Sequence, residues 1–152
     1  MWPIDPLGLS WLTAGRYPIL MTTGPKSGGA PFGFYPQQVA IDAYGDGGFR
    51  FAGMGHRGSL LVLPGGVRGW TPTDAGTLTM ADFALVMDER DRIDFLLLGT
   101  GIAQILPPAE LRRGFEAAGL GLEAMSTGAA ARTFNVLLAE RRRVAAALIA
   151  VA

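Results

Sequence analysis

Two glycine-containing loops are the places in this sequence where backbone groups could bind a ligand. The first, Gly99-Thr100-Gly101, directly follows an apolar run, and glycine there lets a ligand approach the backbone closely. The second combines small residues with Arg132, one turn into an expected helix. N–H groups at a helix N-terminus and an arginine guanidinium both favour an anion such as a carboxylate or phosphate. The candidate ligand-binding residues are therefore Gly99, Thr100, Gly101, Thr127, Gly128 and Arg132.

Both loops also fit a purely structural role. Gln104 stands where a dinucleotide-binding Gly-x-Gly-x-x-Gly motif would have its third glycine, and no Walker-type Gly-Lys-Ser/Thr occurs. A tight turn explains residues 99–101 without a ligand, and small residues at 128–131 allow a helix to pack closely on a sheet. Because both loops follow apolar strands, right-handed crossovers should bring them to the same end of the sheet, where they would form a shallow polar pocket. The sequence leaves a ligand site and a packing role open.

Catalytic and metal-binding residues are sparse. The chain has one histidine and no cysteine, which excludes disulfides, thiol nucleophiles, thiolate metal sites and a multi-histidine centre within one subunit. His56 lies beside Arg57 in a glycine-rich stretch, but no nucleophile stands at a recognisable spacing and Gly-x-Ser-x-Gly is absent. We expect loop residues with structural hydrogen bonds there. We name no catalytic residue, no metal ligand and no cofactor.

Composition narrows the classes of partner. Among 152 residues, 49% are hydrophobic, and 13 basic residues balance 13 acidic ones. Such a chain is long and apolar enough to fold around its own core, and it has no net charge to attract nucleic acid or an anionic membrane surface. A bilayer-spanning helix needs about 20 apolar residues, and no such run is present. We expect a cytoplasmic protein without a transmembrane segment.

The second half of the chain alternates between strand-like and helix-like patterns. Pro107-Pro108 suits the first turn of a helix, Gly119 suits its C-terminal end, and Ser126 or Thr127 caps the next helix. The expected order is strand 93–98, helix 107–118, strand 120–125, helix 126–140 and strand 143–151. This alternation predicts an α/β fold with helices packed on a largely parallel or mixed sheet.

The first half predicts short antiparallel strands. Alternation over 39–44, a glycine-rich turn and Phe49–Phe51 indicate a β-hairpin, and 53–58 is expected to be a loop. Two more short strands are expected at 59–63 and 67–70. Thr79 with Asp82 three residues later then resembles the start of a helix. Together these elements predict a smaller antiparallel sheet added to the α/β core.

Residues 1–36 differ from the rest, because they hold six of the ten prolines and a Gly/Pro/Ser-rich stretch at 22–33. We expect residues 37–152 to form a single α/β domain and residues 1–36 to be a flexible or extraneous N-terminal arm, dispensable for folding. Its apolar residues suit a docking arm, but we favour a misassigned start codon or an expression remnant as the explanation.

The order of short motifs is more specific than any one of them. The motifs are Tyr44-Gly-x-Gly-Gly-Phe-x-Phe, Leu61-Val-Leu-Pro64, Trp70, Ile93-Asp-Phe-Leu-Leu-Leu-Gly-Thr-Gly101, Thr133-Phe134-Asn135 and Ala146-Ala147-Leu148-Ile149. Over about residues 39–151 this order resembles the family of complex I (NADH:ubiquinone oxidoreductase) assembly factor 3, a domain long labelled as of unknown function. The chain looks like a bacterial member.

The resemblance implies a three-layer α/β fold, with a central mixed sheet, helices and a small additional antiparallel β-layer. It also implies a non-enzymatic role in complex I assembly, with complex I subunits or other assembly factors as partners. The cytoplasmic side of the inner membrane would then be the place of action, reached through those partners. Gly99, Thr100 and Gly101 match the family pattern, whereas Arg132 stands where mitochondrial relatives can have a small residue.

Two hypotheses follow. The first is an assembly or interaction factor for respiratory complex I, which is neither an enzyme nor a nucleic-acid binder. The alternative is a small-molecule (anion) binding protein, or an enzyme, that uses the loops Gly99–Gly101 and Thr127–Arg132. We favour the first, because a triad, metal ligands and a dinucleotide fingerprint are all missing from the sequence.

Overall fold

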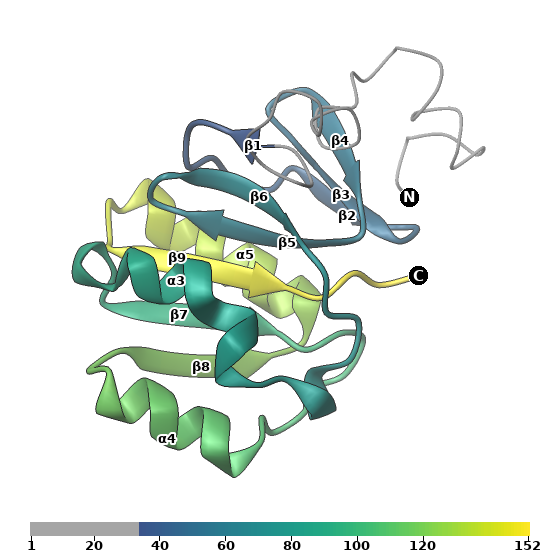
Figure 1. Cartoon of the computed structure of the whole chain (residues 1–152). Helices are drawn as coiled ribbons and strands as arrows, with labels where there is room; N and C mark the ends of the chain where they lie inside the picture. Colours follow the sequence, from purple (N-terminus) through teal and green to yellow (C-terminus); the bar gives the residue numbers. More distant parts are fainter. Residues whose placement is uncertain (1–33) are drawn as a thin grey trace.

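The computed structural model describes residues 34–152, and the predicted arm lies outside them except for its last three residues. The strands are β1 (Phe34–Tyr35), β2 (Ala43–Gly45), β3 (Gly48–Phe51), β4 (Met54–Arg57), β5 (Ser59–Leu63), β6 (Gly66–Trp70), β7 (Phe95–Gly99), β8 (Gly121–Met125) and β9 (Val144–Leu148). The α-helices are α3 (Ala84–Asp88), α4 (Ala109–Ala117) and α5 (Thr127–Ala139), and the 3-10 turns are η2 (Ala75–Thr77), η3 (Met80–Phe83) and η4 (Arg90–Arg92). Figure 1 shows their arrangement.

A six-stranded mixed sheet forms the centre of the fold, in the order β1-β6-β5-β9-β7-β8. Strand β7 pairs in parallel with both β8 and β9, whereas β5 runs antiparallel to β9 and to β6. The β7-α4-β8-α5-β9 segment supplies the parallel part, because each helix returns the chain to the same end of the sheet. The predicted α/β class and mixed sheet are confirmed.

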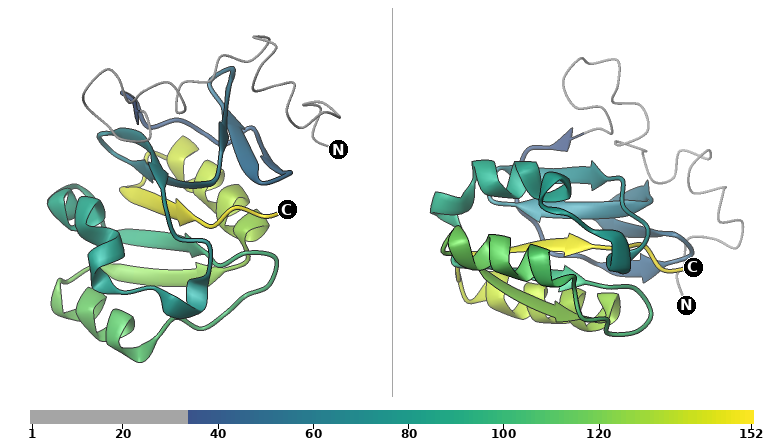
Figure 2. Two further views of the ribbon diagram at one scale, coloured as in Figure 1. Left: turned by 45° about the vertical axis from the view of Figure 1, so that its right-hand side comes forward. Right: turned by 60° about the horizontal axis from the view of Figure 1, so that its bottom comes forward.

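Both faces of this sheet are covered, which gives the expected three layers (Figures 1 and 2). Alternate residues of β5 show the two sides: Leu61 and Leu63 pack in the cluster that includes α3 and α4, whereas Leu60 and Val62 pack in the cluster that includes α5. Such alternation follows from the two-residue period of a strand. The second cluster also contains Phe49 of β3, so a separate three-stranded antiparallel sheet, β2-β3-β4, shares that side with α5.

The α3/α4 side is held by aromatic contacts between distant segments. Phe83 lies edge-to-face with Trp70, with ring centroids 5.3 Å apart, and with Phe115, with ring centroids 5.1 Å apart. The Trp70 indole N–H donates to the Asp82 carbonyl oxygen at 2.8 Å. These contacts fasten the short η3–α3 segment onto the sheet, although it is too brief to be stable alone.

The predicted extent of the first hairpin strand was wrong. Residues 39–42 are not a strand, and β2 covers only Ala43–Gly45. The reason lies in α5: the Asn135 side chain accepts from the Ile41 N–H and donates to the Ile41 carbonyl, each at 2.8 Å. Because a side chain satisfies these backbone groups, Ile41 is buried without strand pairing.

The loop predicted at 53–58 was also wrong, because Met54–Arg57 forms β4 against β3. This strand contains no alternating apolar pattern that could have marked it. Gly48 of β3 permits the pairing, because a Cβ there would collide with the His56 carbonyl oxygen. A close approach between backbones, invisible in a hydropathy pattern, therefore decides this strand.

The remaining elements follow the sequence signals closely. Ser126 caps α5 by accepting from the Ala129 N–H, and Gly119 follows α4 with a φ of +73°. The last strand is shorter than expected, since β9 ends at Leu148. Phe34 and Tyr35, from the end of the predicted arm, pair with β6 as an edge strand.

Phe134 tests the assignment of the α5 face. Its ring is fully buried between α5 and the sheet, so Phe134→Ala should lower the free energy of unfolding by about 3–5 kcal/mol. Val136, on the same helix, is 57% exposed, and Val136→Ala should change it by less than about 1 kcal/mol. Urea denaturation of both variants measures the difference; equal stabilities would contradict the assignment.

Candidate functional site

The two candidate loops meet at one end of the sheet. The Gly101 N–H donates to the Thr127 hydroxyl at 3.0 Å, and the Thr127 N–H donates to the Gly101 carbonyl at 2.8 Å. They meet because β7 and β8 are parallel neighbours, so the segments that follow them leave from the same edge. The predicted juxtaposition of residues 99–101 with the start of α5 is confirmed.

The meeting point is closely packed. Thr127 is fully buried, and its hydroxyl also donates to the Ile149 carbonyl just after β9 at 2.7 Å. A Cβ on Gly99 would lie 2.9 Å from the Thr127 Cα and from its hydroxyl oxygen. Glycine at 99 is therefore required by the approach of α5 to β7, whatever else the loop does.

Thr100 shapes the loop that follows. Its hydroxyl lies 2.6 Å from the Ala103 carbonyl, to which it donates, and it accepts from the Ile105 N–H at 3.0 Å. The Thr100 N–H donates to the Met125 carbonyl at 2.8 Å. Thr100 thus closes a turn over residues 100–105 and ties it to the end of β8.

The start of α5 is covered by protein groups. The first N–H of the helix is bonded to Gly101 and that of Ala129 to the Ser126 hydroxyl. The Tyr44 hydroxyl from β2 packs over Gly128, so closely that a Cβ there would collide with it. These contacts account for the small residues by packing, and an anion at this helix start stays a prediction.

Arg132 lines a different hollow. This hollow, of about 450 Å³, lies between β2 and α5 and is bordered by Arg132, Tyr44, Asn135, Ala131 and residues 41–43. The Arg132 side chain is exposed there. Gly99, Thr100 and Gly101 do not line this hollow. The Arg132 guanidinium does reach Gly128, where an added Cβ would lie 3.5 Å from its Nη1.

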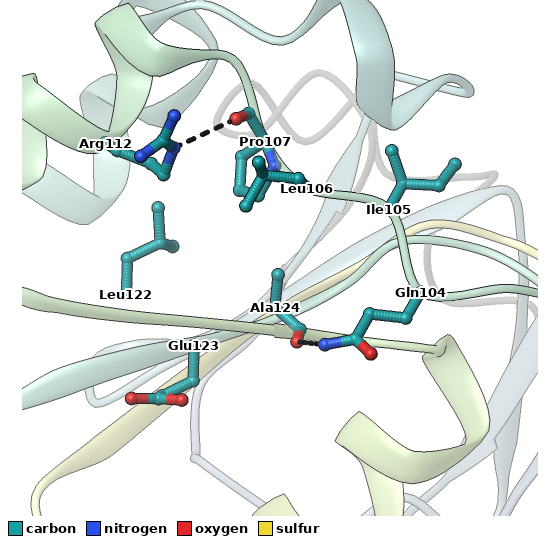
Figure 3. A pocket seen from close by; sticks show the side chains of 8 residues that line it. All are labelled: Gln104, Ile105, Leu106, Pro107, Arg112, Leu122, Glu123 and Ala124. Carbon is teal, nitrogen blue, oxygen red and sulfur yellow. Dashed lines mark hydrogen bonds between the residues drawn. The ribbon is translucent and has the colours of Figure 1, made fainter.

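A second hollow, of about 380 Å³, was missed by the sequence reasoning (Figure 3). The loop Gln104–Pro107 and Arg112 border it on one side, and residues 122–124 of β8 on the other. The loop exposes three large apolar side chains, with Ile102 83%, Leu106 71% and Ile105 40% exposed. The apolar residues between Gly101 and Pro107 could have indicated this hollow, because a surface loop is usually polar.

His56 is a buried neutral imidazole. It is 5% exposed, and its Nε2 lies 3.0 Å from the Ser59 carbonyl, so the ring proton is placed on Nε2 and donated there. Its Nδ1 has no hydrogen-bond partner in the described part of the chain. Burial lowers the His56 pKa to about 4, with the Ser59 hydrogen bond opposing the shift. An inaccessible base of this kind is suited to packing rather than to proton transfer.

Within residues 34–152, no group of three or more His, Asp or Glu side chains is placed to hold a metal ion. No helix in that part of the chain is long and apolar enough to cross a membrane.

The fold is that of a small α/β protein, with helices on a mixed sheet and a separate three-stranded antiparallel sheet. Residues 41–149 match the model of a family described as "Protein of unknown function (DUF498/DUF598)", and the chain belongs to this family. The crystal structure of an outer membrane protein from Bartonella henselae has a similar fold, with a TM-score of 0.75 and 49% identity, covering 78% of this chain and 99% of that one.

Two curated relatives are similar to this chain over most of its described domain. An uncharacterised protein of Rhodobacter capsulatus is 43% identical over 111 residues, covering 73% of this chain and 84% of the relative. The mouse NADH dehydrogenase [ubiquinone] 1 alpha subcomplex assembly factor 3 is 31% identical over 115 residues, or 76% of this chain. The match spans 62% of the mouse protein's length. The resemblance to this assembly-factor family is confirmed as a distant relationship.

Thr127→Val tests the structural role of the loop junction. Valine keeps the shape but leaves the Gly101 N–H and the Ile149 carbonyl without their buried partner, which should cost about 2–4 kcal/mol of unfolding free energy. Thr133→Val, in the same helix and half-buried, should stay within about 0.5 kcal/mol of the parent. Chemical denaturation compares the two; a Thr127→Val protein as stable as the parent would show that the junction carries no stability.

His56 predicts a pH dependence of stability. Its folded-state pKa of about 4 lies below the ordinary 6.5, so the unfolded chain binds the proton more readily between these values. Stability is full above pH 6.5 and falls as the pH drops towards 4, by about 2.5 kcal/mol at pH 4.5. Because the chain has one histidine, this loss should be absent in His56→Gln. Unfolding curves at pH 7 and 4.5 measure it, and parallel losses in both proteins would contradict the assignment.

Proposed function

We propose that this chain is a non-catalytic interaction factor that supports the biogenesis of respiratory complex I. The observation that carries the proposal is the relationship to the mouse assembly factor 3, at 31% identity over 115 residues. The family match at residues 41–149 spans the α/β domain from the start of the hairpin to the last strand. The proposal therefore concerns this domain.

The use of the polar residues supports binding rather than catalysis. Hydroxyls in the candidate loops, those of Thr100, Ser126 and Thr127, are hydrogen-bonded within the fold. His56 is buried, and its lowered pKa keeps it neutral near pH 7. Exposed apolar side chains in the loop 101–108, in contrast, are typical of protein-binding surfaces.

Complex I subunits or other assembly factors are the partners we propose. The place of action is the cytoplasmic side of the inner membrane, where contact with the membrane is made through these partners. The Bartonella henselae relative is described as an outer membrane protein. Fractionation of cells therefore complements the functional test.

A deletion strain tests the function directly. Removing the gene from a bacterium that encodes this chain should reduce assembled complex I on native gels and lower NADH:ubiquinone oxidoreductase activity of membranes, while succinate dehydrogenase stays constant. Expression of the full chain should restore both readouts. Normal amounts of assembled, active complex I in the deletion strain would overturn the proposal.

A further inference from the structure

Strand β8 forms one edge of the central sheet among the residues that the structure describes, where β7 is its one strand neighbour. Two hydrogen bonds fix its orientation: the Gly121 N–H donates to the Asp94 carbonyl, and the Met125 carbonyl accepts from the Thr100 N–H. Backbone groups of a strand alternate between its two edges. The N–H and C=O groups of Leu122 and Ala124 therefore point away from β7, along the outer edge.

A side chain already imitates a neighbouring strand at this edge. The Gln104 amide donates to the Ala124 carbonyl at 2.9 Å, in the position that a backbone N–H would take (Figure 3). Gln104 itself lies on the exposed loop and is not part of a strand. Within residues 34–152, no further strand pairs with β8 beyond β7.

The hollow beside this edge is apolar at its base. Figure 3 shows the Leu122 and Ala124 side chains pointing towards the side bordered by Leu106, Pro107 and Arg112, whereas Glu123 points away from it. The Arg112 guanidinium donates to the Pro107 carbonyl at 3.2 Å and so steadies the rim. An added strand would place alternate side chains in this hollow and the intervening ones on the Glu123 side.

We propose that β8 receives an extended segment of a partner protein as an additional strand, with the local pattern apolar–basic–apolar. The apolar residues occupy the hollow lined by Leu122, Ala124 and Leu106, and the basic residue lies opposite the exposed Glu123 carboxylate. Backbone bonds to Leu122 and Ala124 supply affinity, and these side-chain positions supply specificity. This inference deepens the proposed function and rests on it only for the identity of the partner.

Charge argues against a second copy of this chain at the same edge. The antiparallel register that pairs Leu122 of one copy with Ala124 of the other places Glu123 directly opposite Glu123. Like charges directly opposite on neighbouring strands are destabilising. A basic residue in the partner strand removes this repulsion and adds an attraction, so a different polypeptide is the better occupant.

Peptide titration followed by NMR tests the site. The probe is a synthetic heptapeptide, Thr-Val-Val-Arg-Val-Val-Thr, added to the isotope-labelled full chain at neutral pH. The amide signals of Leu122 and Ala124 should shift most, together with the Gln104 side-chain amide as it leaves the Ala124 carbonyl. A peptide with Glu in place of Arg should bind about two- to fivefold more weakly, and Glu123→Lys should reverse that preference.

Ala124→Pro removes one outward N–H without touching the bonds to β7. It should weaken peptide binding by about tenfold or more, whereas Ala124→Val, which keeps the N–H, should still bind. Leu106 is 71% exposed, so Leu106→Ser should leave folding unchanged. It should also weaken peptide binding, independently of the backbone bonds, by removing an apolar contact in the hollow. Dispersed spectra of each variant confirm that the fold is retained.

The proposal is overturned if the peptide leaves the Leu122 and Ala124 amide signals unchanged. It is also overturned if Ala124→Pro and Leu106→Ser both bind the peptide like the parent. A dimer of this chain in sedimentation, dissociated by Ala124→Pro, would overturn it as well. The proposed function fails separately. A deletion strain with normal complex I refutes the assembly role even if the peptide binds β8, and full rescue by Ala124→Pro refutes the edge while leaving the role intact.

Discussion

The buried hydroxyl of Thr127 must be hydrogen-bonded, and its two bonds fix the ends of three elements. The hydroxyl accepts from the Gly101 N–H, which follows β7, and donates to the Ile149 carbonyl, which follows β9. Thr127 itself is the first residue of α5. A buried hydroxyl without partners is costly, so these ends cannot separate independently. The junction thus links the ends of β7 and β9, which also pair directly in parallel along their length.

The same junction uses the polar groups of both candidate loops in hydrogen bonds within the fold. Gly99 and Gly128 allow close packing around the start of α5, whereas Gly101 adopts a positive φ of 109°. Ligand binding by these loops stays a prediction. The chain between Gly101 and α4 lies at the surface, where Ile102 and Leu106 are exposed, and residues 104–107 border the hollow beside β8. The proposed interaction surface therefore lies next to the loops first considered for ligand binding.

A second constraint joins the small sheet to the core. Asn135 holds both backbone groups of Ile41, and the Gln38 side chain donates to the Val144 carbonyl at 2.9 Å. These bonds lead the chain from β1 across α5 to β2, so that Phe49 and Phe51 complete the cluster over Phe134. The motif Thr133-Phe134-Asn135 thus combines a core anchor with a clamp on a distant segment.

The sequence by itself determined the α/β class, the β-α-β-α-β half and both helix ends at Gly119 and Ser126, because these depend on local periodicity and capping. It also determined that the two loops would meet, since parallel strands end at one edge. Only the tertiary structure decided that Ile41 is held by Asn135, that Met54–Arg57 pairs with β3, and that Arg132 lines a hollow that Gly99–Gly101 do not border. These outcomes depend on contacts between residues far apart in the chain, which leave no periodic pattern in the sequence.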